Sequence, residues 1–198
     1  MKILLHSCCG PCLSGSYPIL VEDFPEAFIT AFWHNPNIHP YIEYLERFKS
    51  FLKTAKILNL SVLSGDTAYG LGIYIKALEG DYSRKRCAKC YEMRLMATAK
   101  AAVAHGFDAF TTTLLISPYQ NHKLIHEVGD KIAKEHNLKY IAADFSSGFS
   151  HSKDFALEHD IYRQKYCGCI FSEHDRYSMS KKHKVPMQSD ALLEASEF

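Results

Sequence analysis

The chain has 198 residues, of which 47% are hydrophobic and 23% are charged, as in an ordinary globular protein. Its 23 basic and 22 acidic residues give a net charge of +1, which excludes a protein that binds nucleic acid through its overall charge. No stretch approaches the roughly 20 apolar residues of a membrane helix, and the apolar start is too short for a signal peptide, so we expect a cytoplasmic protein.

Hydrophobic periodicity and turn residues predict strands and helices that alternate along the chain. The expected strands span residues 2–7, 27–33, 60–63, 108–114 and 139–143. The expected helices span residues 12–22, 41–58, 91–105, 123–136 and 152–165. In the second of these helices, apolar residues recur at helical spacing at Ile42, Leu45, Phe48, Leu52 and Ala55. Residues 66–86 contain several glycines, and there we expect loops and one short helix.

This alternation predicts an α/β fold with a mainly parallel sheet and helices on both of its faces. No repeat, low-complexity run or clear linker divides the sequence. We therefore expect one α/β metalloenzyme domain over residues 1–178. Residues 179–198 lack periodicity and are expected to form a partly disordered C-terminal tail.

The seven cysteines fall into three groups, and none of them is isolated. The first group, Cys8, Cys9 and Cys12, directly follows the first expected strand and contains the turn residues Gly10 and Pro11. Ligands of an open α/β sheet bind at the carboxyl ends of its strands. The N-terminus of a helix also favours the thiolate form, which binds metals and attacks disulfides.

The other two groups are the C-x-x-C pair Cys87 and Cys90 and the C-x-C pair Cys167 and Cys169. Two cysteines of the first group together with the C-x-x-C pair would supply four thiolates. That number suits a [4Fe–4S] cluster or a tetrahedral zinc ion. The C-x-C pair can form a small, strained and therefore reducible disulfide. The alternative is that both of its cysteines are further metal ligands.

Several polar residues are candidates for other roles. Asp144 follows a strand and could ligate iron or donate a proton, although an aspartate in that position is more often a turn residue or an N-cap. The basic run 84–86 directly precedes the C-x-x-C pair, where phosphate binding would bring a substrate close to the metal. The candidate substrate contacts are Arg84, Arg86, His39 and Arg163.

Five ordered stretches of the chain resemble the QueH-type epoxyqueuosine reductases. They are His6–Cys12, Asn35–Pro40, Arg86–Cys90, Thr112–Pro118 and Tyr162–Cys169. The resemblance implies a Rossmann-like sheet related to the nucleotide-hydrolase-like fold of the PP-loop enzymes that modify tRNA. Thiols would replace the phosphate-binding loop of those enzymes, and no ATP use is expected.

The resemblance also implies the reaction, the last step of queuosine synthesis. Epoxyqueuosine in the wobble position of tRNA loses its epoxide oxygen, and an alkene forms with two electrons from an external donor. The implied cofactor is a [4Fe–4S] cluster without cobalamin, held by Cys8, Cys9, Cys87 and Cys90. Cys167 and Cys169 would be the redox-active pair, and Cys12 and Asp144 are candidate ligands of an additional iron. The alternatives are a zinc-stabilised tRNA-binding module and a thiol–disulfide oxidoreductase that uses the C-x-C pair.

Overall fold

Five parallel strands form one sheet in the order β3-β2-β1-β4-β5. The computed structural model describes residues 1–65 and 69–178, so the expected tail at residues 179–198 lies outside the described residues. The strands are β1 (Lys2–His6), β2 (Phe28–Trp33), β3 (Ser61–Ser64), β4 (Ala109–Thr112) and β5 (Lys139–Tyr140). The predicted α/β fold with a parallel sheet is therefore confirmed.

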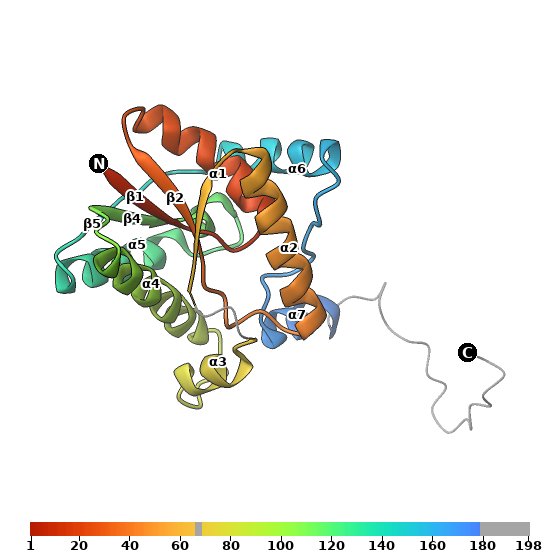
Figure 1. The fold of residues 1–198 in the computed structure, drawn as a ribbon. Helices are drawn as coiled ribbons and strands as arrows, with labels where there is room; N and C mark the ends of the chain where they lie inside the picture. Colours follow the sequence, from red (N-terminus) through yellow and green to blue (C-terminus); the bar gives the residue numbers. More distant parts are fainter. Residues whose placement is uncertain (66–68, 179–198) are drawn as a thin grey trace, which may run out of the picture.

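Helices cover both faces of the sheet (Figure 1). They are α1 (Gly10–Asp23), α2 (Tyr41–Ile57), α3 (Leu71–Ala77), α4 (Arg86–Ala104), α5 (His122–Glu135), α6 (Gly148–Glu158) and α7 (Ile170–Ser178), with a short 3-10 helix η1 (Thr113–Ile116). Helix α1 packs against α2 and α6, while α4 packs against α5. The sheet lies between these two layers, and α3 and α7 lie at the end of the molecule toward which the strands point (Figure 1).

The first strand of the chain, β1, lies at the centre of the sheet between β2 and β4. Its residues Ile3, Leu4 and Leu5 are fully buried, as expected for a parallel strand with helices on both sides. His6 is in register with Phe32 on β2 and with Thr112 on β4. The residues that follow these three strands are therefore brought to the same edge of the sheet.

Helix α2 was predicted correctly, but not all of its regularly spaced apolar residues are buried. Ile42 and Leu52 are 64% and 41% exposed. The buried side of the helix instead carries Glu43, Tyr44, Arg47, Ser50, Phe51, Thr54 and Ala55. The Trp33 ring of β2 meets the Tyr44 ring edge to face and donates a hydrogen bond of 3.1 Å to the Tyr44 hydroxyl. Polar residues replace apolar ones here because this face also meets the cysteine region.

Two helix boundaries differ from the prediction in ways that affect the site. Helix α4 begins at Arg86 rather than at residue 91, so the C-x-x-C pair lies inside its first two turns. Helix α6 ends at Glu158 rather than at residue 165. Two residues after this end, Asp160 adopts a left-handed φ of 48°. The chain then runs without helix to α7, an element that was not predicted.

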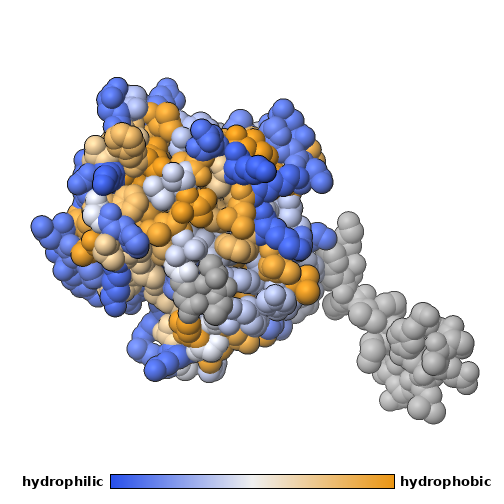
Figure 2. All heavy atoms as spheres, viewed as in Figure 1, coloured by the Kyte–Doolittle hydropathy of each residue, from blue (hydrophilic) through white to orange (hydrophobic). Residues whose placement is uncertain are grey.

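The surface has apolar residues on the side that Figure 2 displays. Orange, apolar residues lie across the middle of this face, and charged residues surround them (Figure 2). Val62 of the edge strand β3 is 39% exposed. Within the described ranges, none of the helices combines the length and the apolar composition that crossing a bilayer requires.

Candidate metal and redox site

The first cysteine group lies at the point where the strand order of the sheet reverses, between β1 and β4. Such a switch point leaves a crevice outside the carboxyl ends of the two strands, where open α/β sheets bind ligands. Contacts cross this crevice directly. The Cys8 amide donates a hydrogen bond of 3.2 Å to Thr113 Oγ1, and the Thr113 hydroxyl lies 3.5 Å from Cys8 Sγ.

Cys9 is the N-cap of α1, with extended backbone angles, and its Sγ accepts a hydrogen bond of 3.3 Å from the Cys12 amide. This thiol therefore takes the place that a serine or aspartate oxygen usually has at an N-cap. Gly10 lets α1 begin directly against α2, because a Cβ on it would lie 2.5 Å from Ser50 O and Thr54 Oγ1. The Gly10 amide donates to Ser50 Oγ at 3.0 Å, which fixes the start of the helix.

Cys8, Cys9 and Cys12 form a buried thiol triad whose sulfur atoms all lie within 4.8 Å of one another, a spacing at which they could hold a metal ion. Hydrogen bonds from Cys12 and Cys9 hold the pKa of Cys8 well below its usual value, whereas burial raises the pKa of Cys9. Gln164 covers the triad, and its Nε2 lies 3.0 Å from Cys9 Sγ and 3.5 Å from Cys12 Sγ. The centre thus combines soft donors, burial and a hydrogen-bond donor to sulfur.

The C-x-x-C pair on α4 is not part of this compact triad. Cys90 is buried and Cys87 is half-buried. Burial raises the pKa of Cys90 to about 12 and also raises that of Cys87. The C-x-x-C pair adds two sulfur donors on α4 to those that precede α1, and soft thiolate donors suit zinc or an iron–sulfur group.

The two most deeply buried cations lie beside the thiols. Arg47 and Arg94 are each only 1% exposed. Arg94 is four residues after Cys90 on α4, and its charge is attracted to Cys90, Cys8 and Cys167. Burial would lower the pKa of Arg94, but these thiols outweigh it and raise the pKa. One cation therefore lies within electrostatic reach of all three cysteine groups.

Arg47 fixes the segment that leads to the C-x-C pair. Its Nε pairs with Glu43 Oε1 at 2.6 Å. Its two terminal nitrogens donate to the Tyr166 carbonyl at 2.8 Å and the Cys167 carbonyl at 2.9 Å. The Tyr162 hydroxyl also donates to Glu43, so the Glu43–Arg47 pair holds the segment 162–167 at several points.

The two cysteines of the C-x-C pair have different surroundings. Cys167 is exposed, and its Sγ accepts a hydrogen bond of 3.3 Å from Gln120. Cys169 is buried directly before α7, and its Sγ accepts a hydrogen bond of 3.4 Å from the Ser172 amide. Burial alone would raise the pKa of Cys169, but hydrogen bonds from Ser172 and Tyr74 outweigh it and hold the pKa below its usual value. Cys169 is the better-stabilised thiolate of the pair.

All seven cysteines are free thiols. The disulfide expected between Cys167 and Cys169 is not present, because the two sulfurs are directed at different hydrogen-bond donors, Gln120 and Ser172. Gly168 between them adopts a φ of +134°, which L side chains rarely adopt. The two thiols are therefore neighbours that differ in exposure and in charge stabilisation.

The candidate substrate contacts occupy three kinds of position. Arg84 and Arg163 are exposed. Arg86 is buried and pairs with Asp175 of α7 at 2.9 Å, so its side chain links two helices. His39 is half-buried, and its amide donates a hydrogen bond of 2.8 Å to the Gly168 carbonyl, which ties it to the C-x-C pair.

Asp144 lies on the surface between β5 and α6, outside the thiol triad. Its Oδ1 accepts a hydrogen bond of 2.9 Å from the Ser146 amide. The side chain and backbone of Ser146 hold the pKa of Asp144 below its usual value. This geometry is that of an aspartate that closes a turn onto its own backbone.

Sequence patterns alone did not identify four residues beside the cysteines. Arg94, Gln164 and Tyr74 interact with their thiols, and Arg47 binds the Cys167 carbonyl. Arginine is normally a surface residue, so an arginine in a helix gives no signal by type. The signal that was available for Arg94 is its place four residues after Cys90, among the small and apolar residues of α4. Tyr74 belongs to the segment in which only a short helix was expected.

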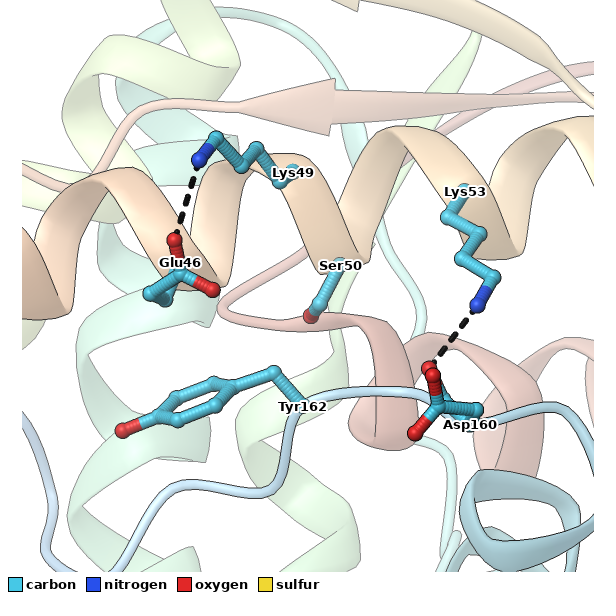
Figure 3. A pocket seen from close by; sticks show the side chains of 6 residues that line it. All are labelled: Glu46, Lys49, Ser50, Lys53, Asp160 and Tyr162. Atoms are coloured by element: carbon cyan, nitrogen blue, oxygen red, sulfur yellow. Dashed lines mark hydrogen bonds and ion pairs between the residues drawn. The ribbon is translucent and has the colours of Figure 1, made fainter.

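A pocket of about 310 Å³ lies beside this site, between α2 and the segment that follows α6. Figure 3 shows its lining, in which Lys49 pairs with Glu46 and Lys53 reaches the carbonyl oxygen of Asp160. No cysteine lines it. The pocket marks where the segment leading to the C-x-C pair docks on α2, and we assign no chemistry to it.

Comparisons with known proteins agree on one family. The family model described as epoxyqueuosine reductase QueH matches residues 3–175. A protein of Dehalococcoides mccartyi with that name is 33% identical over 177 residues, which cover 89% of this chain and 94% of the relative. A protein of Staphylococcus epidermidis with the same name is 35% identical over 192 residues, which cover 86% of this chain and 76% of the relative.

A solved structure is also similar in fold. It is described as a predicted subunit of a tRNA methyltransferase from Methanocaldococcus jannaschii. The TM-score is 0.50 at 16% sequence identity, and the match covers 79% of this chain and 76% of the other. At this level of identity the likeness concerns the fold alone.

Proposed function

The chain belongs to the epoxyqueuosine reductase QueH family of oxidoreductases, and on that premise we propose that it removes the epoxide oxygen of epoxyqueuosine in the wobble position of tRNA. Two electrons and two protons convert the epoxide into an alkene and release its oxygen as water. The electrons come from an external donor. The proposed location is the cytoplasm, where tRNA is available as substrate.

The proposed cofactor is a [4Fe–4S] cluster, without cobalamin, held by Cys8, Cys9, Cys87 and Cys90. The observations that support this proposal are the buried thiol triad at the switch point of the sheet and the buried Arg94, whose charge is attracted to one cysteine of each group. Such a cluster, when bound, would pass electrons one at a time and offer an iron as Lewis acid to the epoxide oxygen. Cys12 stays a candidate ligand of an additional iron, because its sulfur belongs to the thiol triad.

The protein's own residues would orient the substrate and store electrons. As a dithiol, Cys167 and Cys169 can release two electrons and two protons when a disulfide forms between them, which matches the demand of one epoxide. Exposure of Cys167 favours contact with substrate or donor, and the stabilised thiolate of Cys169 favours closure of the disulfide. The wobble base lies in a single-stranded loop, so moving it out of its stack costs little.

Asp144, Arg84, Arg86, His39 and Arg163 remain parts of this proposal with different support. The exposed side chains of Arg84 and Arg163 are free to meet tRNA phosphates. The hydrogen bond from His39 to Gly168 supports a role for His39 in orienting the C-x-C pair toward the substrate. The surface turn around Asp144 and the ion pair of Arg86 support structural roles for these two side chains.

The test is metal and sulfide analysis of protein purified without oxygen, followed by turnover of a tRNA anticodon stem-loop that carries epoxyqueuosine. We expect about four iron and four sulfide per chain, lost when Cys87 or Cys90 is replaced by serine. Cys167→Ser and Cys169→Ser should keep iron and sulfide but stop turnover. Stoichiometric zinc without sulfide would favour a zinc-stabilised tRNA-binding module, for which the compact thiol triad is the supporting observation.

Iron lost from the Cys167 and Cys169 variants would instead make the C-x-C pair part of the metal site. Peptide mapping of oxidised enzyme is the independent check, because the proposed relay needs a disulfide between these two residues. Activity on protein disulfides without any activity on the stem-loop would favour a thiol–disulfide oxidoreductase.

A further inference from the structure

We propose that Arg94 is the internal counter-cation of the cysteine centre, a positioning residue that balances the negative charge of the metal–thiolate group and raises its reduction potential. The inference rests on the proposed function, because it deepens the assignment of the same site. Three observations support it. Arg94 is buried, its guanidinium has no carboxylate partner among the described residues, and thiols lie around it.

The guanidinium of Arg94 is buried without a carboxylate partner among the described residues. Its one hydrogen bond to an oxygen runs from Nη2 to Asn35 Oδ1, at 2.6 Å. Asn35 is neutral and donates in turn to the Ser7 carbonyl at 2.9 Å. The Nε of Arg94 is buried and has no hydrogen-bond partner. An uncompensated buried charge costs several kcal/mol, so a stable fold needs negative charge close to this group.

The thiols are the groups that can supply this charge. Arg94 is attracted to Cys90, Cys8 and Cys167, one cysteine from each of the three groups. Four thiolates around an iron–sulfur core leave a net negative charge on the centre, and each electron that enters makes it more negative. A fixed cation beside the centre therefore stabilises the reduced form more than the oxidised form, which raises the potential.

Arg47, the other deeply buried arginine of the site, has contacts typical of a structural role. Arg47 has its own carboxylate, Glu43, at 2.6 Å, and its remaining donors bind two backbone carbonyls. Its charge is compensated whether or not a metal is bound. Among the described residues Arg94 has no carboxylate partner, and this difference assigns it to the thiolates.

The test compares three reconstituted proteins with the wild type: Arg94→Met, Arg94→Lys and Lys100→Met. Lys100 is exposed on the same helix, so Lys100→Met changes the net charge by the same amount at a solvent-screened site. We expect Arg94→Met to reduce the equilibrium constant of one-electron reduction at least tenfold, a shift of about 59 mV to a more negative potential. Arg94→Lys should recover most of the shift, and Lys100→Met should leave the potential unchanged.

A further variant keeps the experiment decisive if Arg94→Met does not load metal. Asn35→Asp adds a carboxylate at the atom that Arg94 already contacts, and it should lower the potential as Arg94→Met does while the guanidinium stays in place. An unchanged potential in Arg94→Met, or in Asn35→Asp when only that variant loads, would overturn the proposal. Loss of metal from Arg94→Lys as well, with Asn35→Asp at the wild-type potential, would reduce Arg94 to a purely structural residue.

Failure of the proposed function is recognised separately, by the metal analysis of the wild-type protein. If that protein holds zinc and no sulfide, the reductase assignment fails, and Arg94 is then tested by competition with a zinc chelator. A counter-cation predicts at least tenfold weaker zinc binding in Arg94→Met than in Lys100→Met, because the thiolate charge is no longer balanced. Equal zinc affinities would overturn the inference about Arg94.

Discussion

Gly168 is the residue on which the geometry of the C-x-C pair depends most directly. Its φ of +134° is open to glycine and strained for any L side chain. A Cβ at this position would lie 3.1 Å from Arg47 Nη1 and 3.2 Å from Ile38 Cγ1. The backbone between the two thiols is thus both unusual in conformation and closely surrounded.

We therefore expect Gly168→Ala to lower the free energy of unfolding by about 1–3 kcal/mol, the usual cost of such a backbone strain. Turnover should also fall, because the side chain displaces Arg47 from the carbonyls that it holds. Urea unfolding and the stem-loop assay measure the two effects. Gly106→Ala is the control, since Gly106 has a positive φ of 65° but open space around it. It should cost stability and keep turnover, and equal turnover in both variants would contradict the role given to Gly168.

The cysteines could be predicted from the sequence because three close-spaced groups are improbable as core residues. The arginines could not, because burial of a cation is decided by what lies opposite it in the fold. Arg94 becomes a site residue only when β1 and α4 bring Cys8 and Cys90 to the same place. Gln164 is a comparable case, because its Nε2 contacts Cys9 Sγ although the two residues are 155 positions apart in the sequence.

At the scale of helices, the start of α1 is fixed by its close approach to α2. Gly10→Ala would place a Cβ 2.5 Å from two atoms of α2, and at least one of them is backbone. We expect a loss of about 1–3 kcal/mol in the free energy of unfolding from this overpacking, together with weaker metal loading. Gly72→Ala on α3 has nothing within 4 Å and should instead add about 0.5–1 kcal/mol. The denaturant midpoint should fall for Gly10→Ala and rise for Gly72→Ala. Midpoints that change in the same direction would contradict the close packing at Gly10.

Helix α7 carries Cys169 at its N-terminus and is attached to α4 by one buried arginine. Arg86 pairs with Asp175 at 2.9 Å and lies 5.0 Å from the centre of the Phe171 ring. Removing the carboxylate in Asp175→Ala leaves the guanidinium without its charged partner, so we expect local opening of α7 to increase at least tenfold, or about 1.4 kcal/mol. Hydrogen exchange of the α7 amides measures this, with those of α5 as internal reference.

Glu173→Ala removes the same charge from the same helix and is the matched control for Asp175→Ala. It should leave exchange in α7 close to that of the wild type. If hydrogen exchange in α7 increases equally in both variants, the net charge of the helix stabilises it and the ion pair between Asp175 and Arg86 does not.

The elements that sequence reasoning found are the longer ones with an apolar pattern, and the one it missed, α7, is short and is held by an ion pair and ring contacts. Helix α7 has only nine residues and none of them is fully buried, so its sequence gives too short an apolar pattern to identify. The end of α6 was set too late because residues 159–165 contain no glycine or proline, and the left-handed Asp160 ends the helix instead. The apolar spacing of α2 does not mark its whole buried face, because polar residues that contact the cysteine region, such as Arg47, are buried as well.

For the molecule as a whole, the small net charge means that tRNA binding must depend on a few local cations. A protein with a charge of +1 has no long-range attraction to a polyanion. The exposed Arg84 and Arg163 are the cations that the proposal assigns to phosphates. The salt dependence of binding should therefore be shallow and sensitive to these two residues.

We expect the double variant Arg84→Ala, Arg163→Ala to bind the stem-loop more weakly. The slope of log affinity against log salt should fall by about 0.7 for each single-stranded phosphate that the variant no longer neutralises. Fluorescence anisotropy at several salt concentrations gives the slope. Lys100→Ala, an exposed charge elsewhere on α4, should leave it unchanged, and an unaltered slope in the double variant would remove both arginines from the interface.

The central position of β1 has a consequence for how the protein is made. The thiols that follow β1 leave the ribosome before the residues that contact them, because Thr113 follows Cys8 by 105 residues and Gln164 follows Cys9 by 155. At translation rates of about 5–20 residues per second, Gln164 is made roughly 8 to 30 s after Cys9. During that interval the thiols are open to oxidation and to stray metal ions. The thiol triad is therefore covered only after residue 164 has been made, and nascent chains that stall before that residue are the ones most exposed to oxidative damage.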